Sequence, residues 1–385
     1  MKYNAATMRI PFNKPHFTGH ELAYIKDAHA RRQLSGDGFY TRQCRKWMEK
    51  TFGCKMSLLT HSCTGAIEMM AILSDIQPGD EVIIPDYTFV TTANAFVLRR
   101  GVPVFVDIRP DTLNIDEKLI EKAITPKTKA IVAVHYAGVG CEMDVIRELA
   151  KKHKLLVLED SAQSMLATYK GRYLGTLGDM AAFSFHETKN VISGEGGALF
   201  VNKSRFIERA QIIREKGTNR TKFFQGKIDK YTWVDIGSSY LPGEIIAAFL
   251  MAQLEHAVEI NKKRLVLWNR YHKGLIDLEG RGRLRRPIIP SCVKHNAHLY
   301  YILTKNFNER NALLEFLKNK GILAVTHYVP LHASPGGKKF ARYVGDMKVS
   351  RDTEARLIRL PLFYDLTTKE QADVIESIHE FYKTT

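Results

Sequence analysis

Short apolar runs alternate with amphipathic segments over residues 55–202. Each run has the length of a buried strand, and the segments between them have the spacing of helices that pack on a sheet. This alternation is typical of an α/β fold in which βα units wind a mostly parallel sheet covered on both faces. The predicted strands are Leu58–Thr60, Glu81–Ile84, Val102–Val106, Ala130–Val134, Leu155–Leu158, Ala181–Phe185 and Gly197–Val201.

Helices are predicted between these strands, and two of them begin with an aspartate suited to the N-cap, Asp116 and Asp144. The predicted helices are Thr64–Leu73, Thr91–Arg99, Asp116–Ala123 and Asp144–His153.

The pattern changes after Tyr240, where the apolar runs give way to longer helical stretches. The change predicts a large domain over residues 1–245 and a smaller α+β domain over residues 246–385. The elements expected beyond the border are one long helix, Gly243–Tyr271, an alternating segment, His298–Thr304, and two further helices, Ala312–Lys320 and Lys369–Tyr382.

The composition is that of a globular protein: 385 residues, 45% of them hydrophobic, with a formal net charge of +16. The positive charge favours anionic partners such as nucleic acid, an acidic membrane surface or a phosphorylated small substrate. The basic residues come in short bursts without a long tract, which favours a solvated surface over a nucleic-acid groove. Examples are Arg99–Arg100, Lys262–Arg264 and Arg281–Arg286.

Cysteine usage and the N-terminal segment both point to a cytoplasmic protein. The five cysteines are widely spaced and form no C-x-x-C pair, which predicts a reducing compartment and no zinc or other metal site. Met1–Pro15 carries charges and prolines instead of an apolar core, and no run approaches the roughly 18 apolar residues of a membrane span.

Three predicted strand ends carry unusual polar residues, and ligands of open α/β sheets bind at such ends. At the first, Glu159 and Asp160 follow the run Leu155–Leu158 directly, and Gln163 comes shortly after. These residues place a carboxylate and an amide at the tip of a buried strand. The alternative is an N-cap for the following helix.

At the second strand end, Lys189 follows the run Ala181–Phe185 and precedes the glycines of Ser193–Gly197. A partly desolvated lysine loses its proton more readily, as imine formation with a carbonyl requires. Most lysines are solvated surface groups, which is the alternative here.

At the third strand end, Ser62-Cys63-Thr64-Gly65 opens a predicted helix. Free backbone N–H groups and hydroxyls at a helix N-terminus bind phosphate well, although the same residues also make an ordinary helix start. A lysine, an acidic residue and a phosphate cup are together the parts that pyridoxal 5′-phosphate (PLP) requires, because the cofactor is an electron sink only while its ring nitrogen is protonated.

The motif Ser184-Phe185-His186-x-x-Lys189 resembles the lysine motif of the DegT/DnrJ-type PLP-dependent nucleotide-sugar aminotransferases. The resemblance implies an aspartate-aminotransferase-like (fold type I) large domain. Further segments extend it over nearly the whole chain: Gly36–Gly38, Asp75–Val82, Thr91–Arg99, His135–Asp144, Phe183–Asn190, Ile213–Arg220, Asp229–Trp233, Asp235–Pro242 and Leu360–Tyr364.

The resemblance also implies roles for single residues. Lys189 would hold the cofactor covalently and carry the proton of the transfer step, which makes it both carrier and base. Asp160 would pair with the pyridine nitrogen, and Gln163 would hydrogen-bond the phenolic oxygen of the ring. Phe89 matches an aromatic residue that stacks on the cofactor, and its alternative is a core aromatic.

Phosphate contacts are implied for Thr64, Gly65 and Ser184, and for Ser239 from a neighbouring subunit. Many family members read Gly-Tyr-Asn-Tyr-Arg where this chain has Gly237–Leu241, so a serine hydroxyl replaces the asparagine amide. A further motif that faces the sugar nucleotide is matched by His327, Tyr328 and His332, although either histidine fits a structural role as well.

The implied protein is a homodimer with shared active sites. The longest matching segments belong to enterobacterial members that transfer the amino group of glutamate to C4 of dTDP-4-dehydro-6-deoxy-D-glucose. The alternatives are another keto-sugar nucleotide or the gluco epimer. Lys189 argues against a related sugar dehydratase, in which histidine replaces the lysine. A nucleic-acid-binding regulator on the same fold is a remote alternative, since no helix-turn-helix region precedes the sheet.

Overall fold

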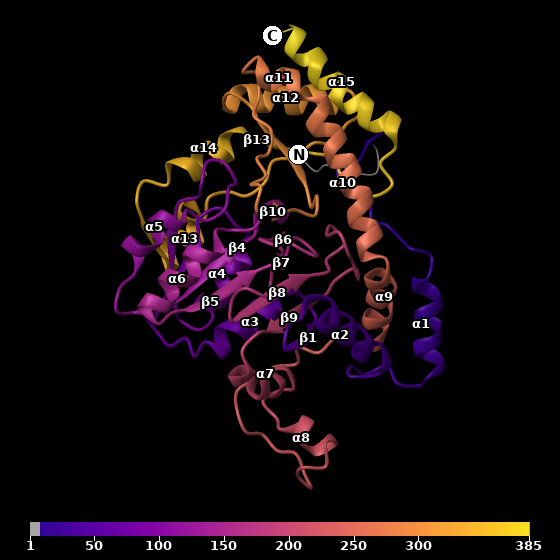
Figure 1. The fold of residues 1–385 in the computed structure, drawn as a ribbon, viewed down its shortest axis with the longest axis vertical. Coiled ribbons are helices and arrows are strands. Elements are labelled where there is room, and N and C mark those ends of the chain that lie inside the picture. Colours follow the sequence, from indigo (N-terminus) through magenta and orange to yellow (C-terminus); the bar gives the residue numbers. More distant parts are fainter. Residues whose placement is uncertain (1–7, 385) are drawn as a thin grey trace.

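The protein is described by a computed structural model that covers residues 8–384, so the first seven residues of the Met1–Pro15 segment and Thr385 lie outside the described part. An eight-stranded sheet forms its centre (Figure 1). From edge to edge the strands are β1 (Met56–Thr60), β9 (Gly197–Val201), β8 (Met180–Ser184), β5 (Leu156–Asp160), β4 (Thr128–Val134), β2 (Glu81–Pro85), β3 (Val102–Val106) and β12 (Arg342–Val344).

The sheet is mostly parallel, as the sequence predicts. β9 runs antiparallel to both β1 and β8, and the remaining neighbours pair in parallel. All of the strands expected over residues 55–202 are present to within two residues at either end. The edge strand β12 was not predicted, because Arg342–Val344 is a short and partly polar segment without an apolar run.

Helices cover both faces of the sheet because strand side chains alternate between two cores. Val82 and Ile84 of β2 point into the core below α3 and α4, whereas Ile83 between them points into the core below α5 and α6. The four helices are α3 (Cys63–Leu73), α4 (Val90–Val97), α5 (Glu117–Ala123) and α6 (Met143–His153).

The two predicted N-caps have different outcomes. Asp116 caps α5, where its carboxylate accepts a hydrogen bond from the backbone N–H of Lys118. The prediction for Asp144 is wrong, because α6 begins after Glu142 and places Asp144 inside its first turn. The Asp144 carboxylate forms an ion pair with Lys170 at 2.6 Å instead.

Two helices near the N-terminus, α1 (Glu21–Ala30) and α2 (Phe39–Phe52), pack against α9 (Glu244–Glu255) and extend the large core. Glu244 joins α9 to α2, since its buried carboxylate accepts hydrogen bonds from the backbone N–H groups of Gly38, Tyr40 and Thr41. These contacts satisfy donors that the start of α2 leaves without intrahelical partners.

The long helix expected over Gly243–Tyr271 is broken at His256 into α9 and α10 (Ala257–Gly274). α10 leads from the large core toward a second core, which also includes Ile10 (Figure 1). That core is built from α10, α11 (Ile276–Gly280), α12 (Phe307–Asn319), α15 (Thr368–Thr384), β11 (Tyr300–Leu303) and β13 (Leu357–Leu360). The domain border near residue 245 stays a prediction.

The segment with α7 (Ile207–Arg214) and α8 (Arg220–Phe224) projects at the end of the molecule opposite α15 (Figure 1). Within residues 8–384, none of the helices combines the length and the apolarity that crossing a membrane requires. The smaller elements are β6 (Thr168–Tyr169), β7 (Arg172–Tyr173), β10 (Val293–Lys294), α13 (Pro335–Phe340) and α14 (Lys348–Arg356).

Candidate active site

A cavity of about 600 Å³ lies where the carboxyl ends of β5 and β8 meet the N-terminus of α3. This is the edge of the sheet at which the sequence predicts a ligand. Most of the predicted site residues line it together: Thr64, Phe89, Asp160, Gln163, Ser184, Lys189, His327 and Tyr328.

Lys189 follows β8 and reaches the cavity half-buried. Within the described part of the chain its amine makes no hydrogen bond or ion pair. Burial lowers the pKa of Lys189, and the positive charge of Arg359 acts in the same direction. A partly buried lysine without a hydrogen-bond partner releases its proton more readily than a surface lysine, which suits a nucleophilic amine.

Asp160 is the last residue of β5, and its side chain lines the same cavity. Its Oδ2 accepts a hydrogen bond from the Thr92 hydroxyl at 2.8 Å, and its Oδ1 accepts one from the backbone N–H of Ala162 at 3.1 Å. Both carboxylate oxygens therefore act as acceptors. A protonated nitrogen placed in the cavity would find a ready acceptor here.

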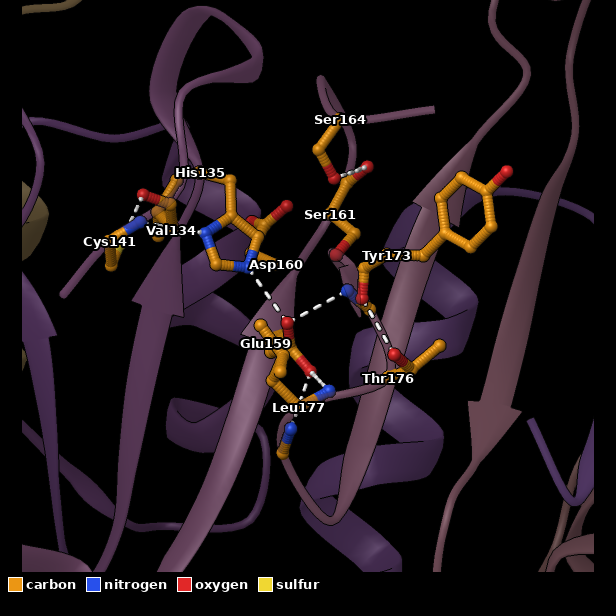
Figure 2. A network of polar contacts seen from close by, with 12 residues as sticks. Val134, His135, Cys141, Glu159, Asp160, Ser161, Ser164, Tyr173, Thr176 and Leu177 are labelled. Atoms are coloured by element: carbon orange, nitrogen blue, oxygen red, sulfur yellow. Dashed lines mark hydrogen bonds and ion pairs between the residues drawn. The ribbon is translucent and has the colours of Figure 1, made fainter. Parts of the chain in front are cut away.

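The neighbouring Glu159 faces away from the cavity into a fully buried network (Figure 2). Its carboxylate accepts hydrogen bonds from the backbone N–H groups of Gly175, Leu177 and Gly178, at 2.6 to 2.7 Å. It also meets the His135 ring at 2.9 Å. The network joins the ends of β4 and β5 to the turn before β8, so the strand that presents Asp160 is held rigidly.

Gln163 links two parts of the cavity wall. Its amide oxygen accepts a hydrogen bond from the backbone N–H of Ala137 at 2.7 Å, and its amide nitrogen donates to the Tyr328 hydroxyl at 2.9 Å. Tyr328 stacks on His327 with 3.7 Å between the ring centres. Burial lowers the pKa of His327 well below its ordinary value, which favours the neutral ring. Nδ1 of this ring is hydrogen-bonded to the Tyr136 hydroxyl.

Thr64 lies in the first turn of α3, directly beside the cavity. The N-cap residue Ser62 accepts a hydrogen bond from the backbone N–H of Gly65 at 3.1 Å. Gly65 itself packs against Tyr240 and does not line the cavity. Gly197 lets β9 approach this helix start closely, because a Cβ at that position would stand 2.4 Å from the backbone nitrogen of Cys63.

The other two predicted residues outside the cavity are His332 and Ser239. His332 pairs with the fully buried Asp86, which meets its ring nitrogen at 2.6 Å and its backbone N–H at 2.8 Å. Ser239 is exposed in the projecting segment, where it bridges to Glu215. Neither residue contacts this cavity, so their predicted roles depend on contacts outside it.

Sequence reasoning missed two arginines that line the cavity, Arg264 of α10 and Arg359 of β13. Arg264 donates to the backbone carbonyls of Ala297 and His298, and burial lowers its pKa to about 10. Arg359 donates to the carbonyl of Thr326. Among residues 8–384 neither guanidinium has a carboxylate partner. Arg264 lies in the predicted helix Gly243–Tyr271 and Arg359 in a segment for which no element was predicted, so nothing in the sequence indicated that either would meet Lys189.

A half-buried lysine without a hydrogen-bond partner among the described residues shares this cavity with a carboxylate and with a helix start that can hold phosphate, and this arrangement fits PLP. The fold and this site define a PLP-dependent aminotransferase of fold type I. The chain belongs to the DegT/DnrJ/EryC1/StrS aminotransferase family, whose profile matches residues 15–379. The predicted fold, family and cofactor are therefore confirmed.

Relatives support the same assignment. GDP-perosamine synthase of Escherichia coli O157:H7 is 30% identical over 97% of this chain and 98% of its own. The spore coat polysaccharide biosynthesis protein SpsC of Bacillus subtilis is 31% identical, with 97% of each chain covered. The Spr1654 protein of Streptococcus pneumoniae in its PLP form has a TM-score of 0.88 at 26% identity, covering 97% of this chain and 99% of that one. These relatives place the chain among the sugar aminotransferases.

Proposed function

We propose that this enzyme transfers the amino group of glutamate to C4 of dTDP-4-dehydro-6-deoxy-D-glucose. The products are dTDP-4-amino-4,6-dideoxy-D-galactose and 2-oxoglutarate. The observation that carries the proposal is that the unpaired amine of Lys189 shares one cavity with Asp160 and with two guanidinium groups that lack carboxylate partners. The finer choice of sugar rests on the long matching segments of the sequence.

When bound, PLP supplies an electron sink that stabilises negative charge at the carbon attached to the amino group. Lys189 would hold the aldehyde carbon of the cofactor through Nζ, and the released neutral amine would move the proton during transfer. Asp160 would accept a hydrogen bond from the ring nitrogen, and Gln163 would lie near the phenolic oxygen. Thr64 and Ser184 would hold the phosphate, with Phe89 against the ring.

The charge of the cavity fits anionic substrates. Arg264 and Arg359 bring two guanidinium groups to its wall, and Asp160 is already engaged by hydrogen-bond donors. Within residues 8–384 neither guanidinium has a carboxylate to balance its charge, so an incoming carboxylate or diphosphate would compensate both groups. Glutamate and a sugar nucleotide each bring such an anion, and they would occupy the cavity in successive half-reactions.

We also propose that the product serves cell-surface polysaccharide synthesis, in enterobacterial common antigen or lipopolysaccharide, and that the enzyme works in the cytoplasm. The name of SpsC refers to polysaccharide biosynthesis, and that of GDP-perosamine synthase to a nucleotide sugar. All five cysteines are free thiols, as in a reducing compartment.

The test is to incubate the PLP-loaded protein with glutamate and dTDP-4-dehydro-6-deoxy-D-glucose and to measure the H3–H4 coupling of the amino sugar by NMR. A small coupling means an axial amino group and the galacto product. A large coupling would replace it with the gluco epimer. If the protein binds PLP through Lys189 and yields no amino sugar, the substrate is a different keto-sugar nucleotide.

We propose in addition a homodimer in which Ser239 serves the partner's cofactor phosphate. The projecting segment that holds Ser239 exposes large apolar side chains, Trp233 at 78% and Phe224 at 68%, which a partner subunit would cover. Mixing inactive Lys189→Ala and Ser239→Ala subunits tests this arrangement. Hybrid dimers would contain one complete site and regain activity that neither variant has alone. If Ser239→Ala is fully active, the proposed contact is wrong.

A further inference from the structure

Two threonines lie behind the carboxylate of Asp160. Thr92, in the first turn of α4, is fully buried and donates to Oδ2 of Asp160 at 2.8 Å. Its hydroxyl oxygen lies 3.0 Å from the hydroxyl oxygen of Thr88, which precedes the helix and lines the cavity. The three side chains therefore form one continuous chain of hydrogen bonds from the cavity wall to the carboxylate.

The direction of both bonds follows from counting hydrogens. A carboxylate oxygen has none to give, so the single hydroxyl hydrogen of Thr92 is committed to Asp160. The hydroxyl of Thr88 must then donate to Thr92. A hydroxyl group that accepts a hydrogen bond becomes a stronger donor. The hydrogen bond from Thr88 to Thr92 therefore strengthens the one that Thr92 donates to Asp160.

We propose that Thr92, supported by Thr88, is a positioning residue that keeps Asp160 ionised and turned toward the nitrogen of the cofactor ring. The inference rests on the proposed role of Asp160. Hydrogen bonds donated to a carboxylate favour its charged form, and they fix its rotamer. The other ionisable groups that face Asp160 are Lys189, Cys63 and Tyr328. Among the described residues, only the Thr92 hydroxyl and the backbone N–H of Ala162 donate to its carboxylate.

Without Thr92 the carboxylate becomes a stronger base and draws the shared proton away from the ring nitrogen. The ring then loses positive charge, so the nitrogen that joins Lys189 to the cofactor becomes more basic. Thr92→Val preserves the shape of the side chain and removes only the donor. We expect the pH midpoint of the visible absorbance of lysine-bound PLP to rise, and the affinity for PLP to fall about tenfold.

Three further variants separate this role from packing. Thr92→Ser restores the hydroxyl and should return both values toward those of the unaltered protein. Thr88→Val should raise the midpoint by a smaller amount, because Thr92 still donates. Thr304→Val is the matched control: Thr304 is also fully buried, donates to the carbonyls of Asn306 and Arg356, and does not line the cavity. It should lower the thermal stability and leave the midpoint unchanged.

The inference is overturned if Thr92→Val binds PLP with an unchanged midpoint, or if Thr92→Ser behaves like Thr92→Val. If Thr92→Val does not fold, Thr88→Val and Thr92→Ser decide the question. The inference is then overturned if the midpoint is unchanged in Thr88→Val and shifted in Thr92→Ser. Failure of the proposed function looks different, because the unaltered protein itself would then either form no lysine-bound PLP or bind PLP and yield no amino sugar from dTDP-4-dehydro-6-deoxy-D-glucose.

Discussion

Glu159 and Asp160 are consecutive residues of β5 whose carboxylates serve opposite sides of the sheet (Figure 2). Glu159 is fully buried and holds the turn at Gly175–Gly178, whereas Asp160 lines the cavity. The alternation of side chains along a strand makes this division unavoidable. One carboxylate therefore anchors the strand that positions the other.

The anchor can be tested by Glu159→Gln. One amide oxygen cannot replace two carboxylate oxygens that receive hydrogen bonds from three backbone N–H groups and face His135, and the amide nitrogen would meet donors. We expect the free energy of unfolding to fall by about 3 kcal/mol.

Denaturant unfolding measures this loss. Glu121→Gln is the control, since Glu121 is half exposed and pairs with Lys152 and His153 at the surface, where solvent screens such pairs and they contribute little to stability. Equal stability changes in the two variants would show that the buried network does not hold the strand.

Lys189→Ala removes the amine that would hold the cofactor. The side chain makes no hydrogen bond or ion pair within residues 8–384, so the variant should remain folded. We expect it to bind PLP without the visible absorbance of a lysine-bound cofactor and to lose transamination. Lys170→Ala, at an exposed lysine paired with Asp144, should keep both properties. Normal turnover by Lys189→Ala would disprove the assignment.

The pH dependence of Lys189 follows from its burial, which lowers its pKa from the ordinary 10.5. Below the lowered pKa the amine is protonated and unreactive, and above it the amine is neutral. The protein without cofactor should therefore begin to bind PLP covalently at a lower pH than an exposed lysine would. Absorbance titration gives the midpoint, with Lys189→Ala as the blank, and a midpoint at or above 10.5 would contradict the burial argument.

Asp160→Asn tests the partner of the ring nitrogen. The amide keeps the size of the side chain and removes the negative charge that would stabilise a protonated ring. We expect the variant to bind PLP through Lys189 and to lose at least about tenfold in kcat, because a charge-assisted hydrogen bond is lost. Full activity would mean that another group protonates the cofactor.

Arg359→Met tests whether the Arg359 guanidinium, which has no carboxylate partner among residues 8–384, binds substrate. Removing a cation that compensates an anion should raise KM about tenfold for the substrate whose carboxylate or diphosphate it contacts. Separate KM values for glutamate and for the sugar nucleotide identify that substrate. Arg351→Met, at an exposed position of α14, is the control. Unchanged KM values for both substrates would exclude Arg359 from binding.

The sequence by itself determined the class of fold, the strands of the large sheet apart from its edge strand β12, and the cofactor. Buried strands appear in the sequence as apolar runs. Asp160 and Lys189 come at or after the ends of two such strands, at the edge of the sheet where ligands bind. Each of these features depends on residues that are close together in the chain, so the sequence pattern is enough to predict it. The family motif around Lys189 then indicated the same cofactor.

Only the tertiary structure decided which distant residues join the site. Thr92, Arg264 and Arg359 are ordinary members of two helices and a strand in the sequence, and their meeting with Asp160 and Lys189 depends on how those elements pack. Packing also places His332, the last residue of the motif that begins at His327, outside the cavity and against Asp86. Side-chain contacts across long sequence separations follow from the complete fold, and no local pattern records them.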